Sequence, residues 1–381
     1  MTGDRSRSAA AVRASLVLAL VAAAPAGAGD WPTFRGDAGS SGVADEALPE
    51  RLEPRWVFEI EDGFQSGAAI VGARVYAGST DGQLYALDFA SGAPTWKYAA
   101  GAAIASAPAL SAGVVFFGDA QGTFHAVDGV GGQRKWTFKA GAEIVSSANV
   151  SEGNVLFGSH DQSLYCLAAA DGSLRWKVET DGLVYGTPAV WSGSAVSAGC
   201  DGLLRVVRIA DGAVVRQVPL GGYAGASPAL HSGRAFVGNF ENQVVAVDLE
   251  QGRIVWTYEH PERKFPFLSS AATDGKLVVV GGRDKVVHGV DAATGQARWT
   301  YPAGSRVDSS PVIAGDRVYF GTEGGEVVAL ALATGKAVWK FDTGAAIAAS
   351  PAVAGGRLVI GTTEGQLYCF GAPEPAGANE P

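Results

Sequence analysis

The chain has 381 residues, a formal net charge of −9 and three cysteines. An acidic protein of this kind repels the phosphates of nucleic acids, so the composition argues against nucleic acid as a partner. Glycine is abundant, with 53 residues. Apolar residues come in short or alternating runs, which is typical of strands joined by tight turns.

The first 28 residues have the features of a secretory signal. Basic residues come first, an apolar run follows at 14–24, and small residues precede Gly29. We therefore predict a signal peptide over 1–28, cleaved near Ala28, and a soluble mature protein that is periplasmic or secreted. The apolar run is too short to span a bilayer comfortably and no other run reaches about 18 residues, so no transmembrane segment is expected.

Residues 29–53 follow this segment and are rich in Gly, Ser, Asp and Pro. This composition predicts an extended, irregular strap over the surface. Trp31 and Phe34 are large apolar groups in a polar context. We expect these two side chains to pin the strap to the rest of the protein.

Residues 54–370 contain a repeat with a period near forty, which indicates a propeller or solenoid. The clearest copy is Val75–Trp96 (VYAGSTDGQLYALDFASGAPTW). A tryptophan ends most copies; the steps are 40 residues, with a single step of 43, and Arg216 stands where one tryptophan is due. The repeated tryptophans are Trp56, Trp96, Trp136, Trp176, Trp256, Trp299 and Trp339.

The two ends of the repeat region complement each other. Pro54–Ile60 resembles an outer strand with nothing before it, whereas the eighth copy stops after Phe370 without an outer strand. Closure of a ring by the N-terminal strand removes both open edges. We therefore predict an all-β protein, an eight-bladed β-propeller over 54–370 with four antiparallel strands per blade, and a flexible C-terminal tail over 371–381.

The residue types in each copy fit this geometry. Small residues begin each copy and suit crowded innermost strands, while the tryptophans suit the gap between diverging outer strands, where each buries about 150–250 Å². Glycine recurs before each outer strand and is expected to supply a positive φ in a hairpin turn. The predicted role of the repeated tryptophans is therefore structural.

The copy Gly-x-Val-Tyr-x-Gly-x-x-Asp-Gly-x-Leu-Tyr-Ala-Leu-Asp-x-x-Ser/Thr-Gly-x-x-x-Trp resembles the repeat of the pyrroloquinoline quinone (PQQ) enzymes. The segment Trp31–Asp37 (WPTFRGD) is similar to the opening segment of many exported PQQ-like repeat proteins. The resemblance covers residues 54 to 370. It implies either a quinoprotein dehydrogenase or a cofactor-free binding and assembly protein, of which the outer-membrane assembly factor BamB is the familiar case.

The dehydrogenase group uses a vicinal cysteine pair, a tryptophan on the axis and Glu, Asn and Asp ligands around calcium. The sequence has no adjacent cysteines, no long insertions and no carboxylate cluster in the axis-facing columns. We therefore predict a non-catalytic, BamB-like scaffold that binds other envelope proteins as a monomer, with no cofactor and no catalytic residue. The alternatives are a PQQ- and calcium-dependent oxidoreductase of the alcohol-dehydrogenase type, and a propeller that binds a small ligand or carbohydrate.

Candidate contact residues lie where the copies differ, because repeat insertions often mark a binding face. The step of 43 residues falls in His260–Phe267, where Arg263, Lys264 and Phe265 are candidates for partner contact, while Phe267 matches an apolar core column. The other candidates are Phe240, an aromatic residue in a turn, and the charged pair Arg306 and Asp308.

One column of the repeat should face the mouth of the central channel, because its members precede each inner strand. These residues are Gln65, Ala105, Val145, Tyr185, Gly225, Leu268, Asp308 and Ala348. The histidines are scattered over different copies and predict no metal site. The three cysteines are expected to be free, with Cys166 and Cys369 buried as small apolar residues.

Overall fold

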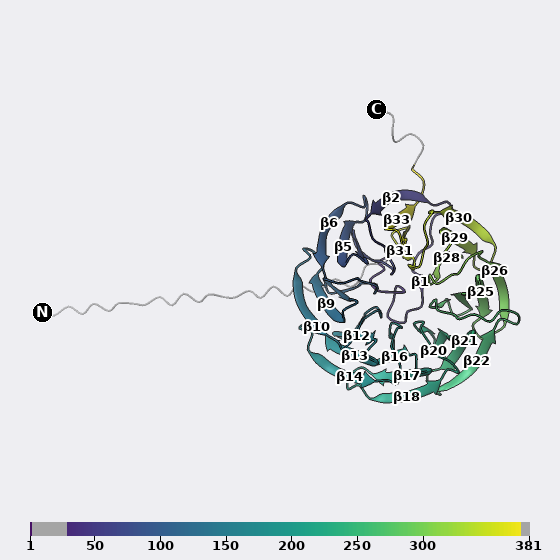
Figure 1. Cartoon of the computed structure of the whole chain (residues 1–381), viewed down its shortest axis with the longest axis horizontal. Coiled ribbons are helices and arrows are strands. Elements are labelled where there is room, and N and C mark those ends of the chain that lie inside the picture. Colours follow the sequence, from purple (N-terminus) through teal and green to yellow (C-terminus); the bar gives the residue numbers. More distant parts are fainter. Residues whose placement is uncertain (2–28, 375–381) are drawn as a thin grey trace, which may run out of the picture.

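The computed structural model describes Met1 and residues 29–374. The predicted signal peptide therefore lies, apart from Met1, outside the described residues, as does the tail from residue 375. Every regular element of residues 29–374 is a strand, and the strands form eight sheets arranged as a closed ring (Figure 1). Within this part of the chain no helix is long and apolar enough to cross a membrane.

Blades 1 to 4 follow one another along the chain. Their strands are β3 (Ala69–Val71), β4 (Arg74–Gly78), β5 (Gln83–Asp88) and β6 (Pro94–Ala99); β7 (Ala109–Ser111), β8 (Val114–Gly118), β9 (Thr123–Asp128) and β10 (Arg134–Lys139); β11 (Asn149–Ser151), β12 (Asn154–Ser159), β13 (Ser163–Ala168) and β14 (Leu174–Glu179); and β15 (Ala189–Trp191), β16 (Ser194–Ala198), β17 (Leu203–Arg208) and β18 (Val214–Pro219).

Blades 5 to 8 repeat the arrangement and complete the ring. Their strands are β19 (Ala229–His231), β20 (Arg234–Gly238), β21 (Gln243–Asp248) and β22 (Arg253–Glu259); β23 (Ala272–Thr273), β24 (Leu277–Gly281), β25 (Val286–Asp291) and β26 (Ala297–Pro302); β27 (Val312–Ala314), β28 (Arg317–Gly321), β29 (Glu326–Ala331) and β30 (Ala337–Asp342); and β31 (Ala352–Ala354), β32 (Arg357–Gly361), β33 (Gln366–Gly371) and β2 (Glu53–Glu59).

The N-terminal strand closes the ring, as the sequence predicted. β2 pairs antiparallel with β33, with Trp56 opposite Cys369 and Phe58 opposite Leu367. Blade 8 is thus built from both ends of the repeat region. Because each blade packs against two neighbours, closure gives every sheet two covered faces.

The repeated tryptophans join neighbouring blades at the rim. In blade 8, the indole Nε1 of Trp56 donates a hydrogen bond of 3.0 Å to the carbonyl of Phe89 in the next blade. Trp136, Trp176, Trp256 and Trp299 make equivalent bonds to the blade that follows each of them, whereas Trp339 bonds to the carbonyl of Leu52, at the end of the strap. The indole of Trp96 packs in the same place, although its buried Nε1 has no partner. The predicted structural role of these side chains fits these contacts.

A glycine beneath six of the seven indoles, all except that of Trp339, makes this packing possible. Gly172 has a φ of +74°, and a Cβ at this position would lie 2.5 Å from the indole of Trp136. Gly252 occupies the same turn of blade 5 with a φ of +64°, but the neighbouring group is Arg216, 3.2 Å from the position of a Cβ. The glycines therefore meet two requirements, the predicted positive φ and the space for an aromatic ring.

The strap crosses the centre of the ring (Figure 1) and bonds to successive inner strands. In six blades, the backbone amide at the same position of the repeat donates a hydrogen bond to a carbonyl of the strap. The donors are Ile70, Leu110, Val190, Leu230, Thr273 and Ile313. β1 (Val43–Ala44) then pairs in parallel with β27. The strap is thus an ordered cover over one end of the channel, where the sequence predicted an irregular surface segment.

Arg35 inserts from the strap into this end of the channel. Its guanidinium donates to the carbonyls of Ala271, Ser310 and Pro311, which belong to blades 6 and 7. The side chain is buried, and burial lowers the pKa of Arg35 to about 9. Trp31 is buried as predicted, and the strap is therefore fixed by a charged group as well as by an aromatic one.

Candidate functional site: the channel mouth and its surrounding face

The channel opens on the face opposite the strap. The strap bonds to one end of the inner strands. The residues predicted to face the channel mouth come just before the opposite end of these strands. A pocket of about 240 Å³ lies on the axis, and Phe34 of the strap lines it. Seven of the eight column residues also line this pocket: Gln65, Ala105, Val145, Tyr185, Gly225, Leu268 and Asp308. The structure thus places the column at the channel, as expected.

Hydroxyl groups form the wall of the channel. Seven blades contribute one each: Ser66, Ser147, Thr187, Ser227, Ser270, Ser310 and Ser350. Most of these oxygens accept a hydrogen bond from a backbone amide of the preceding blade. Ser270 Oγ, for example, lies 3.0 Å from the amide nitrogen of Ser227. The same bond occurs at Ser147, Ser227, Ser310 and Ser350. These hydroxyls therefore hold the inner strands of adjacent blades together.

Asp308 is the charged residue of the pocket, but its partner differs from the expected one. Its carboxylate accepts from Arg283 Nε at 3.0 Å and from Arg283 Nη2 at 2.7 Å. The hydrogen bond to Asp308 raises the pKa of Arg283. The predicted local pair between Arg306 and Asp308 is therefore wrong. Arg283 reaches Asp308 from a turn of the preceding blade, whereas the Arg306 side chain is exposed.

The pocket offers a poor site for calcium and an ortho-quinone cofactor. Asp308 is the one carboxylate among its lining residues, and Arg283 engages both of its oxygens. Calcium takes six to eight oxygen ligands. Across residues 29–374, no group of three or more His, Cys, Asp or Glu side chains could hold a metal ion. The residues present therefore do not fit the cofactor of the quinoprotein dehydrogenases.

The cysteines also lack a reactive arrangement. Cys166 and Cys369 are buried and free, as predicted, and Cys200 is free and partly exposed. Burial raises the pKa of both Cys166 and Cys369 to about 12, so each remains a thiol at neutral pH. These side chains fill space within blades 3 and 8.

The face around the mouth carries exposed aromatic side chains on its loops and turns. We call them the aromatic arc: Tyr185, Tyr223, Phe240 and Phe265. Tyr223 is 61% exposed, and its carbonyl accepts the amide of Phe240 at 2.8 Å. Tyr185 packs on His160 with ring centroids 4.3 Å apart. The arc thus combines ordered backbone with solvent-exposed rings.

The loop His260–Phe267 is anchored to blade 6 and presents its tip to solvent. Arg263 Nη1 donates to the carbonyl of Asp284 at 2.8 Å, so this predicted contact residue fixes the loop. Lys264 is 72% exposed and lies 3.7 Å from Glu259. Phe267 is buried, as expected from its column, while Phe265 is exposed. Lys264 and Phe265 are therefore the residues of this loop that a partner could contact.

The predicted contact residues lie in one sector of the mouth face. The amide of Phe267 bonds to the carbonyl of Asn239, beside Phe240, and the amide of Arg283 bonds to the carbonyl of Pro266. Arg283 in turn bonds to Asp308. Blades 5, 6 and 7 are thereby connected. Tyr185 and Tyr223 were not among the predicted contact residues, because the sequence does not show which aromatic residues remain exposed.

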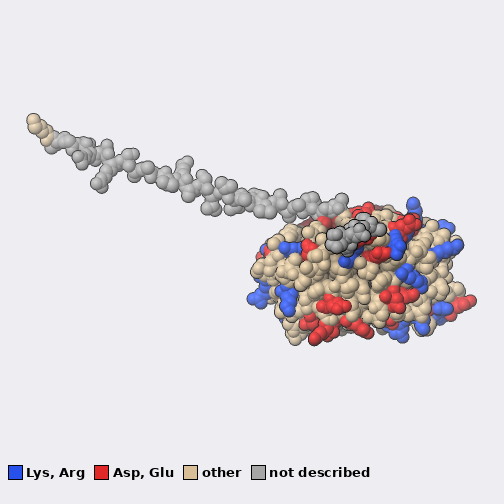
Figure 2. All heavy atoms as spheres, turned by 90° about the horizontal axis from the view of Figure 1, so that it is seen from above, with Lys and Arg blue, Asp and Glu red and all other residues tan. Residues whose placement is uncertain are grey.

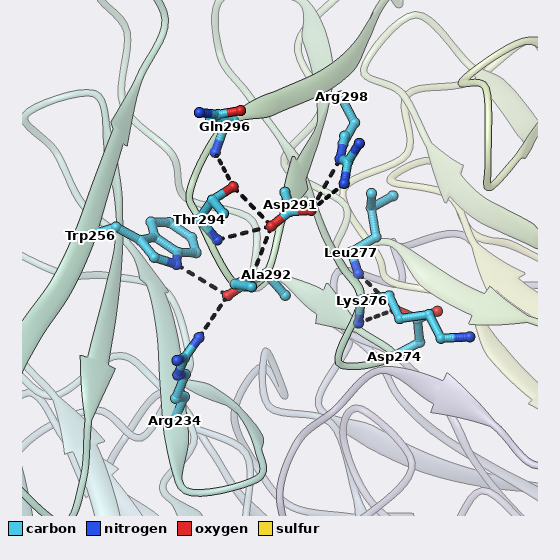
Figure 3. Close-up of polar contacts among 11 residues, drawn as sticks. Arg234, Trp256, Asp274, Lys276, Leu277, Asp291, Ala292, Thr294, Gln296 and Arg298 are labelled. Carbon is cyan, nitrogen blue, oxygen red and sulfur yellow. Dashed lines mark hydrogen bonds and ion pairs between the residues drawn. The ribbon is translucent and has the colours of Figure 1, made fainter.

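A second hollow of about 660 Å³ lies near the turns of blade 6, and Lys276, Asp291 and Arg298 contribute to its lining. Figure 3 shows the hydrogen bonds that Asp291 makes at this hollow. Asp291 accepts from Arg298 and from Thr294, and these hydrogen bonds lower the pKa of Asp291 to about 2. The side chain of Asp274 accepts hydrogen bonds from two backbone amides of its own turn. This network shapes the hairpin turns of blade 6.

Charges are mixed over the side of the molecule. Figure 2 shows Lys and Arg side chains interspersed with Asp and Glu on the surface in view. No continuous basic field appears there. Such a surface gives no electrostatic footprint for a nucleic acid.

The fold and the channel define an eight-bladed β-propeller built from PQQ-like repeats. The sequence model of the family described as outer membrane protein assembly factor BamB matches residues 53–152, 142–262 and 200–372. The chain therefore belongs to this family. None of the curated proteins matches the chain.

Solved structures with the same fold include proteins of both groups. BamB from Moraxella catarrhalis has a TM-score of 0.73 at 19% identity, over 85% of this chain and 99% of that one. The quinohemoprotein alcohol dehydrogenase from Comamonas testosteroni has a TM-score of 0.77 at 13% identity, over 93% and 83%. A europium-containing methanol dehydrogenase has a TM-score of 0.75 at 14% identity, over 91% and 98%. At these identities the likeness shows the fold alone.

Proposed function

We propose that the protein is an exported, non-catalytic scaffold of the cell envelope that binds another protein on its mouth face. The observation that carries this proposal is the aromatic arc, four exposed rings on neighbouring blades beside the channel mouth. Aromatic side chains with a polar surround are typical of the central anchors of protein interfaces. Membership of the BamB family supports a role in assembly.

The surroundings of the arc also suit a protein partner. Lys264 is exposed next to Phe265 in the chain, and Arg306 is exposed in the loop that leads into blade 7, so charged side chains accompany the rings on this face. Charges at the border of an interface mainly set orientation and association rate. Backbone bonds join Tyr223 to Phe240 and Phe267 to Asn239, and this order lowers the entropy cost of binding at these positions.

Site-specific photo-crosslinking tests the proposal in the intact envelope. A photoreactive residue at Tyr223, Phe240 or Phe265 should give adducts with the same envelope protein, identified by mass spectrometry. Val130 is the matched control, because it is 70% exposed but lies in the turn after β9, on the strap side. Equal adducts from Val130, or no adducts from the three aromatic positions, would contradict the proposal.

The oxidoreductase alternative has its own test. PQQ and calcium are added to the purified protein, and cofactor absorbance and reduction of an acceptor dye are followed. We expect no turnover, since the pocket offers a single carboxylate that Arg283 already engages. Clear turnover would overturn the proposed non-catalytic function.

A further inference from the structure

The rim of the ring consists of eight strands, each bonded to its blade on one side only. They are β2, β6, β10, β14, β18, β22, β26 and β30. The outer edge of such a strand offers unpaired amides and carbonyls to any other extended chain. Proteins usually protect these edges with charged side chains, so the charge on each rim strand is informative.

Among these eight rim strands, β18 is the one without a charged side chain at an exposed position. Its exposed residues are Val214, Val215, Gln217 and Pro219. Every other rim strand has at least one exposed charge, such as Lys97 in β6, Lys135 in β10, Lys177 in β14, Glu59 in β2, Arg253 in β22, Arg298 in β26 and Lys340 in β30. β18 therefore lacks the protective exposed charge of the other rim strands, and Pro219 stands only at its end.

β18 also lacks the repeated tryptophan. Arg216 takes its place and lies over Gly252 of the next blade, and no ion-pair partner for it occurs within residues 29–374. Exposed apolar residues continue along the rim on both sides, at Leu174 in β14 and Ile254 in β22. Figure 1 shows β14, β18 and β22 in succession along the ring.

We propose that the outer edge of β18 binds an extended polypeptide segment of a partner, which adds to blade 4 as a fifth strand. Backbone hydrogen bonds would supply the affinity of such strand addition, and side-chain contacts its specificity. Apolar residues on the added strand fit Val214 and Val215, and a carboxylate on it fits the unpaired Arg216. The site lies on the rim, so it is separate from the mouth face.

A second copy of this chain is a less suitable occupant. Two β18 strands paired antiparallel about an axis at Arg216 would set two guanidinium groups opposite each other, and like charges directly opposite are destabilising. A single strand pair would also bury less than the roughly 1,200 Å² of a stable interface. A partner segment with an acidic residue avoids the repulsion.

A blocked octapeptide that alternates valine with threonine around one central glutamate is the probe. Titration of the whole protein is followed by calorimetry and by hydrogen exchange of the β18 amides. We expect binding and slower exchange in β18, with affinity about tenfold weaker after Val215→Lys. A peptide N-methylated at alternate residues should not bind, because it cannot complete the backbone ladder.

Val338→Lys is the matched control. Val338 occupies the same column in β30 and is 47% exposed, against 39% for Val215, but its strand carries exposed charges. We expect this variant to bind like the wild type. An equal loss in both variants, full binding of the methylated peptide, or no binding at about 1 mM peptide would overturn the proposal. If sedimentation shows dimers of the wild-type protein and Val215→Lys abolishes them, the edge of β18 binds a second copy of this chain instead.

Discussion

The contact between a rim tryptophan and the glycine of the next blade predicts how substitution by alanine should change stability at three glycines. Gly153, Gly172 and Gly252 have positive φ values of +73°, +74° and +64°. A Cβ at Gly153 would meet nothing within 4 Å, whereas at Gly172 it would lie 2.5 Å from the Trp136 indole. Gly153→Ala therefore measures only the cost of placing an L-residue at a positive φ, without any steric contact.

The magnitudes follow from these distances. An L-residue in the left-handed region costs about 1–2 kcal/mol, which is the expected loss of unfolding free energy for Gly153→Ala. Overpacking adds about 1–3 kcal/mol, so Gly172→Ala should lose about 2–5 kcal/mol. At Gly252 the near atom, 3.2 Å away, belongs to the flexible Arg216 side chain. Gly252→Ala should therefore resemble Gly153→Ala.

The assay is urea unfolding followed by circular dichroism, with stability compared at a common m-value. A fourth variant combines Arg216→Trp with Gly252→Ala and should raise the cost at Gly252 to that at Gly172. Equal losses for Gly153→Ala and Gly172→Ala, within about 0.5 kcal/mol, would refute the idea that the indole dictates glycine in these turns.

Three further predictions follow from the ring and its buried polar groups. Arg216→Trp alone should stabilise the fold by about 1 kcal/mol, because Gly252 already leaves room for an indole; a lower melting temperature would contradict this. Deletion of residues 54–60 should cause severe destabilisation, because blade 8 loses β2 and the ring stays open; an unchanged melting temperature would argue against closure. Burial alone would raise the pKa of Asp119, but hydrogen bonds from His125 and nearby amides outweigh it and the pKa is lowered. This carboxylate therefore stabilises the fold above its unfolded pKa of about 3.9, and the contribution is lost as the pH falls further. In the Asp119→Asn variant, the unfolding free energy should depend less on pH in the acid range. An unchanged pH dependence there would contradict the stabilising role of the Asp119 carboxylate.

The fold was predictable because its causes are local and repeated. Tryptophan, glycine and small inner residues recur at fixed spacing, and each repeat supplies an independent sign of the same strand or turn. The closing strand was predictable for the same reason, since the eighth copy lacks an outer strand. β2 begins at Glu53, within one residue of the expected position.

Contacts between different blades could not be obtained in this way. The sequence places Arg306 two residues from Asp308, yet the carboxylate bonds to Arg283 on the preceding blade, since backbone geometry brings that turn to the mouth. The strap likewise contains no repeat, so nothing in its residues indicates that its carbonyls meet six inner strands. The exposure of Tyr223 depends on its neighbours in the folded ring.

The strap has a consequence for the order in which the protein reaches its final state. Its residues and β2 precede all the blades in the chain, yet they bond to blades as distant as β27, β30 and β33. Contacts of such long sequence separation form slowly, because the intervening loop must close first. A segment that is synthesised before every blade is thus among the last to find its partners. Until blade 8 exists, both ends of the ring present unpaired strands that other chains could capture.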